Sequence, residues 1–396
     1  MDKLFQKFYD KYQSTQLDIV RNYIIKIDWS DQLIGLKGSR GIGKTTLILQ
    51  HIKQNYSANK EALYISLDDL YFTTHTLYDL ARVFHKKGGR FLAVDEVHKY
   101  DNWAIEIKNI YDDMPDLKVV FTGSSLLHIQ DAKADLSRRA VMYNLAGLSL
   151  REFIQFETGC VLPIFSLDDI INNHIDIAMH LSEHKILQYF DDYLNFGYYP
   201  FYNQNKVTFH QKLSEVILTI LEVDITQFAD IKTSNIIYLK KLVQIISTAS
   251  PFKPSMTALS QRTGITINTM KHYLKLIHDA ELIQLLYTPN KSINSLNKPE
   301  KIYLQNPNLM YNQGGVHTNI GSLREIFFFN QIERNHTVKA SKQADFLIDE
   351  KYTFEIGGKS KSKKQIKDLK NSFVVKDNID IGHENMIPLW LFGFMY

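Results

Sequence analysis

The sequence holds a single cysteine, Cys160, in 396 residues, and it has no long apolar run. One cysteine excludes an internal disulfide and a cysteine-rich metal site, and it is typical of a protein kept in a reducing cytoplasm. A membrane-spanning helix needs a predominantly apolar stretch of about 18 residues, and none occurs. The first residues also lack an apolar run followed by a small-residue cleavage site. We therefore expect a cytoplasmic protein that does not enter the membrane.

The sequence also lacks a large excess of either sign of charge. The 46 Lys and Arg residues nearly balance the 43 Asp and Glu residues, which leaves a formal net charge of +3. Such a small surplus does not by itself indicate a nucleic-acid partner, so any basic surface has to be local. Hydrophobic residues make up 44% of the chain, which excludes global disorder. The length exceeds what one hydrophobic core usually covers and predicts two or three domains.

A glycine-rich loop is the first motif that carries chemistry. It has the pattern G-x-x-x-x-G-K-T and lies between an apolar run, 32–37, and a helical pattern, 45–56, which is the setting of a P-loop. Its glycines let the backbone amides point at phosphates, and the following helix adds positive potential. We expect Lys44 to reach the β- and γ-phosphates and Thr45 to bind Mg²⁺. The predicted nucleotide-binding residues are Gly38, Ser39, Arg40, Gly41, Ile42, Gly43, Lys44, Thr45 and Thr46.

A second apolar segment, 90–94, ends in the carboxylate pair Asp95 and Glu96. This is the form of a Walker B strand, in which the first acid holds the Mg²⁺ shell and the second orients and deprotonates the attacking water. We therefore predict Asp95 as a magnesium ligand and Glu96 as the catalytic base.

A third apolar segment begins at Lys118 and ends in Thr122-Gly123-Ser124-Ser125. We expect this strand to lie beside the first one, where a hydroxyl at its tip can hydrogen-bond the γ-phosphate or the lytic water. Ser124 is the first candidate for that role and Thr122 the second. A turn that only caps a helix is the alternative.

Strands alternate with helices through this region, which predicts an α/β fold. The parallel sheet should be covered on both faces and should bind its ligand at the carboxyl ends of the strands. The other expected elements are a strand over 62–66, helices over 76–85 and 103–113, and a strand over 140–145.

Several segments together closely resemble a family of prokaryotic AAA-type ATPases, and the resemblance covers the full chain. These segments are 38–45, 94–100, 121–125, 135–139 and 148–153. The resemblance implies a P-loop NTPase with ATP as its ligand, followed by a helical lid, a winged helix and a small α/β domain similar to restriction endonucleases. We place the domains at 1–150, 151–248, 249–305 and 306–396.

The family also implies that Arg138 or Arg139 acts in trans as an arginine finger in a homo-oligomer. A guanidinium at this position can neutralise charge that builds on the γ-phosphate of a neighbour's nucleotide. The alternative is a solvated basic turn.

Residues 255–286 have the pattern helix, turn, helix, strand, which is typical of a helix-turn-helix. Lys271, His272 and Lys275 fall on the outer face of the second helix, where lysines can contact the phosphates of double-stranded DNA. Few cations line this helix and no arginine is available to recognise guanine, so a packing or protein-contact role stays open. The segment 291–301 would be the wing.

The C-terminal region carries Glu325, Asp345 and Glu355, and a nuclease of the resembled fold holds its metal with an Asp and a Glu. The lysine expected two residues after Glu355 is replaced by Gly357, and the nearest candidate, Lys359, is displaced. We therefore predict an inactive nuclease domain. The basic run 359–364 is a second candidate for contact with a nucleic-acid backbone, with a solvated surface as the alternative. The apolar tail 387–396 predicts a closing strand.

The sequence thus predicts an enzyme that hydrolyses ATP to ADP and phosphate with Mg²⁺ and couples nucleotide state to rearrangement of the winged helix, on or near DNA. The absence of the guanine-recognising motif Asn-Lys-x-Asp favours ATP over GTP. A nucleotide-controlled DNA- or protein-binding switch with little turnover is the alternative, and an active nuclease is a third reading.

Overall fold

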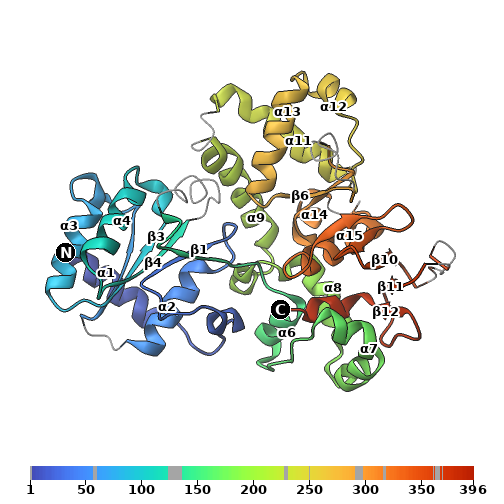
Figure 1. Ribbon diagram of the computed structural model, residues 1–396, viewed down its shortest axis with the longest axis horizontal. Helices are drawn as coiled ribbons and strands as arrows, with labels where there is room; N and C mark the ends of the chain where they lie inside the picture. Colours follow the sequence, from blue (N-terminus) through green and yellow to red (C-terminus); the bar gives the residue numbers. More distant parts are fainter. Residues whose placement is uncertain are drawn as a thin grey trace. The chain divides into compact units, whose positions relative to one another are not determined.

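The structure is a computed structural model that describes residues 2–56, 60–123, 136–226, 231–248, 250–289, 298–314, 318–359, 361, 366–367 and 369–396. The chain forms two compact units, residues 1–147 and 148–396. Figure 1 shows the helices and strands of both. Among the described residues, no helix has both the length and the apolar composition needed to cross a bilayer.

The first unit is built on a five-stranded sheet with the order β2-β3-β4-β1-β5. All neighbouring strands in it are parallel, and β1 pairs with β4 as the sequence predicts. The strands are β1 (Leu33–Lys37), β2 (Ala62–Ser66), β3 (Phe91–Asp95), β4 (Lys118–Gly123) and β5 (Val141–Asn144). Every residue of β3 is buried, which explains why its sequence is apolar throughout and does not alternate. The α/β P-loop fold predicted for this region is confirmed.

Helices cover both faces of this sheet. They are α1 (Asp2–Ser14), α2 (Lys44–Asn55), α3 (Leu77–Lys86) and α4 (Trp103–Asp113). The rings of His51 in α2 and Phe91 in β3 lie 5.3 Å apart, and those of Trp103 in α4 and Phe121 in β4 lie 5.5 Å apart. Phe121 pairs with Val94, and Val94 points away from the face that carries Phe91 because the two are an odd number of residues apart. Helices α2 and α4 therefore pack on opposite faces.

The second unit begins with a series of helices. They are α6 (Leu150–Thr158), α7 (Leu167–Leu181), α8 (Ile186–Asp192), α9 (Phe209–Thr219) and α11 (Ile236–Thr248). A capping box starts α6, in which Ser149 accepts from the Glu152 backbone and Glu152 accepts from the Ser149 backbone. The helix-turn-helix follows as α12 (Met256–Thr263) and α13 (Ile267–Asp279), joined at Gly264 with φ 75°. The antiparallel strands β6 (Ile283–Leu286) and β7 (Lys301–Leu304) come next.

The last part of this unit is a mixed sheet with the order β12-β11-β10-β9-β8, preceded by α14 (Pro307–Gly314) and α15 (Ile320–Ile332). Its strands are β8 (Val338–Ala340), β9 (Phe346–Ile348), β10 (Tyr352–Gly357), β11 (Ser372–Lys376) and β12 (Met386–Pro388). The predicted closing strand over 387–396 is wrong beyond Pro388, because the chain continues as the 3-10 helix η11 (Leu389–Phe394). Proline has no backbone N–H for a strand ladder, so the strand ends there. The three-part division of residues 151–396 stays a prediction.

Candidate nucleotide-binding site

The glycine-rich loop joins β1 to α2 at the carboxyl edge of the first sheet. Gly38, Gly41 and Gly43 have φ angles of 148°, 84° and 93°, a region that residues with side chains rarely adopt. A Cβ atom on Gly38 would lie 2.3 Å from the carbonyl oxygen of Leu145 and 2.5 Å from Ile42 Cδ1. The loop therefore requires glycine at position 38.

Lys44 is the first residue of α2, and its ammonium turns back into this loop. The side chain is buried, and Nζ donates to the carbonyl oxygens of Gly38 at 2.7 Å and Ser39 at 2.8 Å. Ile42 is buried and anchors the loop, whereas Thr46 is exposed on the first turn of α2. A cation and a helix N-terminus held at one loop attract an anion, so a phosphate group fits this site.

Arg21 is a buried residue that the sequence analysis missed. Its Nη1 donates to the carbonyl oxygens of Ile42 at 3.1 Å and Ala146 at 2.8 Å, and its Nη2 donates to that of Gly147 at 3.0 Å. The guanidinium therefore joins the P-loop to the segment that follows β5. Arg21 lies outside every motif, so the sequence carried no signal for this role.

Asp95 ends β3, and hydroxyl groups from three other elements meet at its carboxylate. Thr45 Oγ1 of α2 and the Tyr64 hydroxyl of β2 each lie 2.6 Å from Asp95 Oδ2. Thr122 of β4 donates to Oδ1, and the Glu96 backbone N–H donates to the same oxygen at 3.1 Å. Asp95 is 3% exposed, so these donors replace the water that a carboxylate would otherwise bind.

The Thr45 hydroxyl and the Asp95 carboxylate fit a magnesium ion. Both are hard oxygen ligands of the kind that Mg²⁺ prefers, and Thr45 directly follows the P-loop lysine. Over the part of the chain that the structure describes, no group of three or more His, Cys, Asp or Glu side chains could hold a metal. A magnesium ion would therefore take few protein ligands here and complete its shell with phosphate oxygens and water.

Glu96 follows Asp95 in the left-handed backbone region, with φ 54° and ψ 42°. This region costs a residue with a side chain about 1–2 kcal/mol, so the surrounding structure must hold Glu96 there. Its Oε2 lies 3.4 Å from His98 Nε2 and 3.9 Å from Arg40 Nη2. The His98 side chain is fully buried, whereas that of Glu96 is 25% exposed. A carboxylate that contacts two nitrogen groups and is still partly exposed to solvent is suited to orient a water molecule.

His98 was not among the predicted site residues, although it lies only two positions after Glu96. The spacing Asp-Glu-x-His was the available signal. The contact itself depends on the left-handed turn at Glu96, and side-chain type does not reveal such a turn.

The remaining predicted catalytic residues have different surroundings. Ser124 lies outside the described residues, so the structure describes only the second candidate, Thr122. Arg138 is exposed. Arg139 instead pairs with Asp112 of α4, with Nε–Oδ1 and Nη2–Oδ2 distances of 2.9 and 3.0 Å. Of the two arginines, Arg138 is thus the one whose side chain is open to a neighbouring molecule.

In the second unit, a lysine lies between two of the acidic residues named in the sequence analysis. Lys301 Nζ is 3.1 Å from Glu325 Oε2 and 3.2 Å from Asp345 Oδ1. Burial, and secondly the charge of Asp345, raises the pKa of Glu325. The Lys301 ammonium therefore pairs with two of the three carboxyl groups that the sequence points to in this region.

Glu355 forms an ion pair with Lys361, and the sequence analysis had named Lys359 as the nearest candidate. Strand β10 ends at Gly357, and the Lys361 backbone N–H donates to the Gly358 carbonyl oxygen at 2.9 Å. A Cβ atom at position 357 would lie 2.6 Å from Lys361 Cβ. The glycine at the expected lysine position therefore makes room for Lys361, a lysine near Glu355 that the sequence analysis did not consider.

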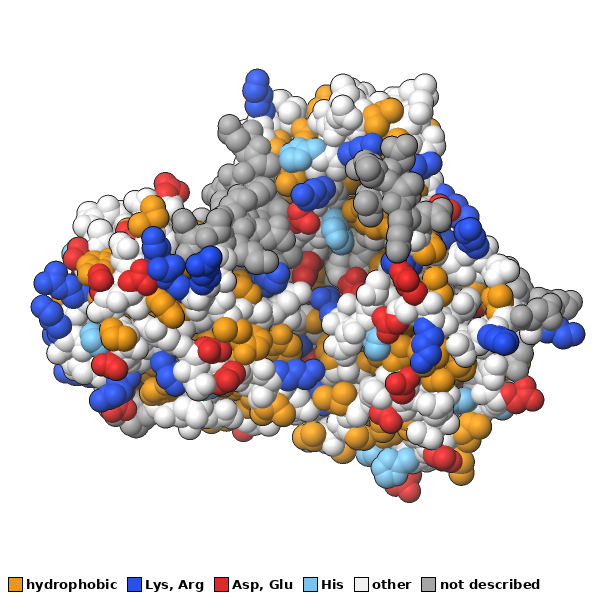
Figure 2. Space-filling model, in the orientation of Figure 1, with side chains coloured by type: hydrophobic (Ala, Val, Ile, Leu, Met, Phe, Trp, Pro, Cys, Tyr) orange, Lys and Arg blue, Asp and Glu red, His pale blue; other side chains and the backbone are white. Residues whose placement is uncertain are grey.

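The predicted DNA-contact residues lie on the exposed side of α13. His272 and Lys275 are exposed and Lys271 is half-buried, and all three line a hollow of about 400 Å³. Figure 2 shows Lys, Arg and His side chains among hydrophobic ones on the face that carries α13. Most of the predicted wing, and all of the basic run 359–364 except Lys359 and Lys361, lie outside the described residues.

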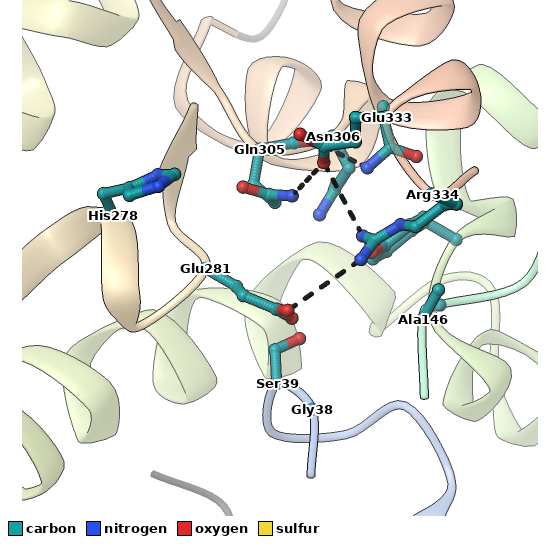
Figure 3. Close-up of polar contacts among 12 residues, drawn as sticks. Gly38, Ser39, Ala146, His278, Glu281, Gln305, Asn306, Glu333 and Arg334 are labelled. Carbon is teal, nitrogen blue, oxygen red and sulfur yellow. Dashed lines mark hydrogen bonds and ion pairs between the residues drawn. The ribbon is translucent and has the colours of Figure 1, made fainter. Parts of the chain in front are cut away.

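A second polar cluster, absent from the sequence analysis, surrounds Arg334 just after α15 (Figure 3). The Arg334 side chain is 12% exposed, with Nη1 3.9 Å from Glu281 Oε1 and Nη2 4.0 Å from Glu333 Oε1. Gln305 Nε2 donates to Glu333 Oε1 at 3.0 Å. Burial raises the pKa of Glu333, although the charge of Arg334 opposes that shift. The cluster ties the end of α15 to the region around β6 and β7.

Comparison with known proteins supports the class of the first unit. Residues 30–154 match the family described as AAA domain, and residues 187–319 match a domain of unknown function. A relative, Uncharacterized protein MJ1637 of Methanocaldococcus jannaschii, is 24% identical over 93% of this chain and 84% of its own length.

Two solved structures show weak likeness. AMPPCP-bound DnaA from Aquifex aeolicus matches with 13% identity and a TM-score of 0.26, over 70% of this chain and 88% of DnaA. C. elegans PCH-2 matches with 15% identity and a TM-score of 0.24, over 70% of this chain and 67% of PCH-2.

Together, the parallel sheet, the P-loop and the Asp95 cluster define a P-loop nucleotide-binding domain. More particularly, the chain contains a domain of the AAA type, as its resemblance to AAA-type ATPases predicts.

Proposed function

We propose that this protein is a magnesium-dependent ATPase that hydrolyses ATP to ADP and phosphate. The observation that carries the proposal is the meeting of Thr45, Tyr64 and Thr122 at the Asp95 carboxylate, beside a P-loop whose lysine lies inside the loop. Glu96 follows in the chain, with its carboxylate near two nitrogen groups.

In this proposal the residues 38–46 hold the phosphates through backbone amides and Lys44. Thr45 and Asp95 hold the magnesium ion, which when bound supplies charge neutralisation at the phosphates. Glu96 orients a water molecule and accepts its proton as the water oxygen forms a bond to the γ-phosphorus. The bond from that phosphorus to the bridging oxygen breaks, and ADP leaves with the electron pair.

Arg138 is our candidate for the arginine finger, because Arg139 is held by Asp112 within its own molecule. The finger requires a homo-oligomer, in which the guanidinium of one molecule reaches the nucleotide of the next. We further propose that the nucleotide state rearranges the lid and the winged helix, since β5 leads through residues 145–149 directly into α6.

The test is ATP hydrolysis by the purified protein, with and without double-stranded DNA, at two salt concentrations. Turnover that rises with DNA and loses this rise at higher salt would support a DNA-coupled ATPase. Turnover that ignores DNA would support an ATPase that serves a protein partner, with the winged helix as scaffold. No turnover under any condition would exclude hydrolysis.

A switch with little turnover is the second candidate, and one observation favours it. His98 and Arg40 both contact the Glu96 carboxylate, and such contacts can hold a base away from its water. Tight binding of ATP with negligible hydrolysis would select this candidate. We keep the prediction of an inactive nuclease domain, because Lys301 occupies the space between Glu325 and Asp345.

A further inference from the structure

Tyr64 contacts the Asp95 carboxylate from the edge strand of the first sheet. In the register of β2 and β3, Ser66 pairs with Asp95, and Tyr64 lies two residues before Ser66 on the same face. Its hydroxyl reaches Asp95 Oδ2 at 2.6 Å, the same oxygen that Thr45 contacts. Tyr64 is therefore aimed at the carboxylate that serves magnesium in the proposed function.

The Tyr64 hydroxyl can act on this carboxylate only as a donor. The residue is 5% exposed. A tyrosine hydroxyl ordinarily keeps its proton at physiological pH. A hydrogen bond from this hydroxyl to a charged carboxylate is stronger than one between neutral groups.

A lysine of the first helix also contacts Tyr64. Lys11 Nζ lies 4.6 Å from the centre of the Tyr64 ring and 3.4 Å from its hydroxyl oxygen. One turn earlier in α1, Lys7 forms an ion pair with Asp69, which lies shortly after β2. Helix α1 is thus fastened to the segment that carries Tyr64.

The Thr122 hydroxyl and the Glu96 backbone N–H hold Asp95 Oδ1, whereas the hydroxyls of Thr45 and Tyr64 hold Oδ2. A side-chain carboxylate rotates about its last bond through a broad, two-fold range of positions. The Thr45 hydroxyl would serve two groups when the metal binds, with its hydrogen on Asp95 and an oxygen lone pair on magnesium. The Tyr64 hydroxyl has no such second duty, so it can hold Asp95 Oδ2 in one orientation.

We propose that Tyr64 is a positioning residue for the magnesium-binding carboxylate Asp95, and that Lys11 supports Tyr64 in this role. The inference rests on the proposed function, because it takes Asp95 as a magnesium ligand. Residues that orient a metal ligand typically change metal affinity or activity by about 10- to 100-fold when they are lost.

The experiment measures how Mg²⁺ tightens the binding of a non-hydrolysable ATP analogue, by calorimetry on the full chain. Tyr64→Phe keeps the ring and removes only the hydroxyl. We expect the Mg²⁺ concentration for half-maximal tightening to rise about 10-fold, with the affinity measured without Mg²⁺ unchanged. Lys11→Met should shift it in the same direction by less. An unchanged Mg²⁺ dependence in Tyr64→Phe would overturn the role of Tyr64, and in Lys11→Met that of Lys11.

Tyr78→Phe is the matched control, since the Tyr78 hydroxyl donates to the Asp113 carboxylate at 2.7 Å. It removes the same type of hydrogen bond from a tyrosine to an aspartate, and it should leave the Mg²⁺ dependence unchanged. A shift as large as that of Tyr64→Phe would also overturn the inference. Failure of the proposed function is visible separately, because wild-type protein would then lack ATP hydrolysis or Mg²⁺-dependent binding before any variant is compared.

Discussion

Each residue at the nucleotide site has its chemistry set by its immediate contacts. Asp95 is a buried carboxylate whose donors are hydroxyl groups and one backbone N–H. Hydroxyl groups are neutral donors, whereas a lysine or arginine partner would bring a positive charge of its own. A carboxylate held by hydroxyl groups stays available as an oxygen ligand for a divalent cation. Asp345 differs, because Lys301 already pairs with it.

Variants of Lys44 and Glu96 should separate ATP binding from ATP hydrolysis. Lys44→Ala removes the cation inside the P-loop, and we expect loss of ATP binding. Glu96→Gln keeps the size of the side chain but cannot accept the proton, so binding should persist while turnover falls by a factor of about 100 or more. Equilibrium binding and steady-state hydrolysis on the same preparations check both. Equal turnover in the Gln variant would remove Glu96 from the mechanism.

Glu333 should make the stability of the protein depend on pH. Burial raises its pKa above the ordinary glutamate value. Between those two values the folded state keeps a proton that the unfolded state has released, so the free energy of unfolding falls as pH rises. Glu333→Gln should remove the contribution of Glu333 to the slope of the free energy of unfolding against pH.

Urea unfolding between about pH 5 and pH 8 measures this slope. The control is Glu183→Gln, which changes an exposed glutamate of the same unit and should leave the slope unchanged. A slope that is identical in wild type and in Glu333→Gln would contradict the prediction.

At the scale of elements, α13 combines a buried face with a polar one. Met270, Tyr273, Leu274, Leu276 and Ile277 are buried, whereas His272 and Lys275 are exposed. The buried residues fix the helix in its unit and leave the polar face for a partner. The same arrangement serves DNA binding and protein contact, so the element alone does not choose between them.

Measuring DNA binding over a series of salt concentrations distinguishes DNA binding by α13 from protein contact. If α13 binds DNA, the double variant Lys271→Ala/Lys275→Ala should weaken binding to all sequences. It should also reduce the slope of log affinity against log salt by about 2, since each phosphate contact contributes about 0.9. The matched control is Lys86→Ala/Lys87→Ala, which removes two exposed lysines at the end of α3. Equal salt slopes in all three proteins would assign α13 to packing or to a protein partner.

At the scale of the whole molecule, the arginine finger requires more than one copy of the chain. Arg138 is exposed while Arg139 pairs with Asp112, so the two neighbours should differ in function. We expect Arg138→Ala to lose hydrolysis and Arg139→Ala to retain most of it. Mixing Arg138→Ala with Lys44→Ala should restore part of the activity, because one protein brings an intact P-loop and the other an intact finger.

Hydrolysis of the mixture, set against the sum of the separate proteins, measures this restoration. Mass measurement in solution with ATP gives the oligomeric state on the same samples. A monomer at all concentrations, together with no restored activity, would remove the finger.

Much of the first unit follows from local sequence signals. The apolar runs that begin at residues 32, 90 and 118 predict strands that match β1, β3 and β4, because each run ends at glycine, charged or hydroxyl residues. Helix α4 begins and ends where predicted. The second unit was less predictable. The tail after Pro388 is apolar like a strand but forms η11, because Pro388 ends the strand ladder.

The sequence by itself determined the P-loop, the Asp95-Glu96 pair and the alternation of strands with helices that builds a parallel sheet. Each of these depends on residues that are neighbours in the chain. Only the tertiary structure decided that Tyr64 hydrogen-bonds Asp95, that Arg21 hydrogen-bonds the P-loop and that Lys361 pairs with Glu355. These contacts join residues on different strands, helices and loops. Hydrogen bonds form over about 3 Å in space at any separation along the chain, so spacing in the sequence does not reveal them.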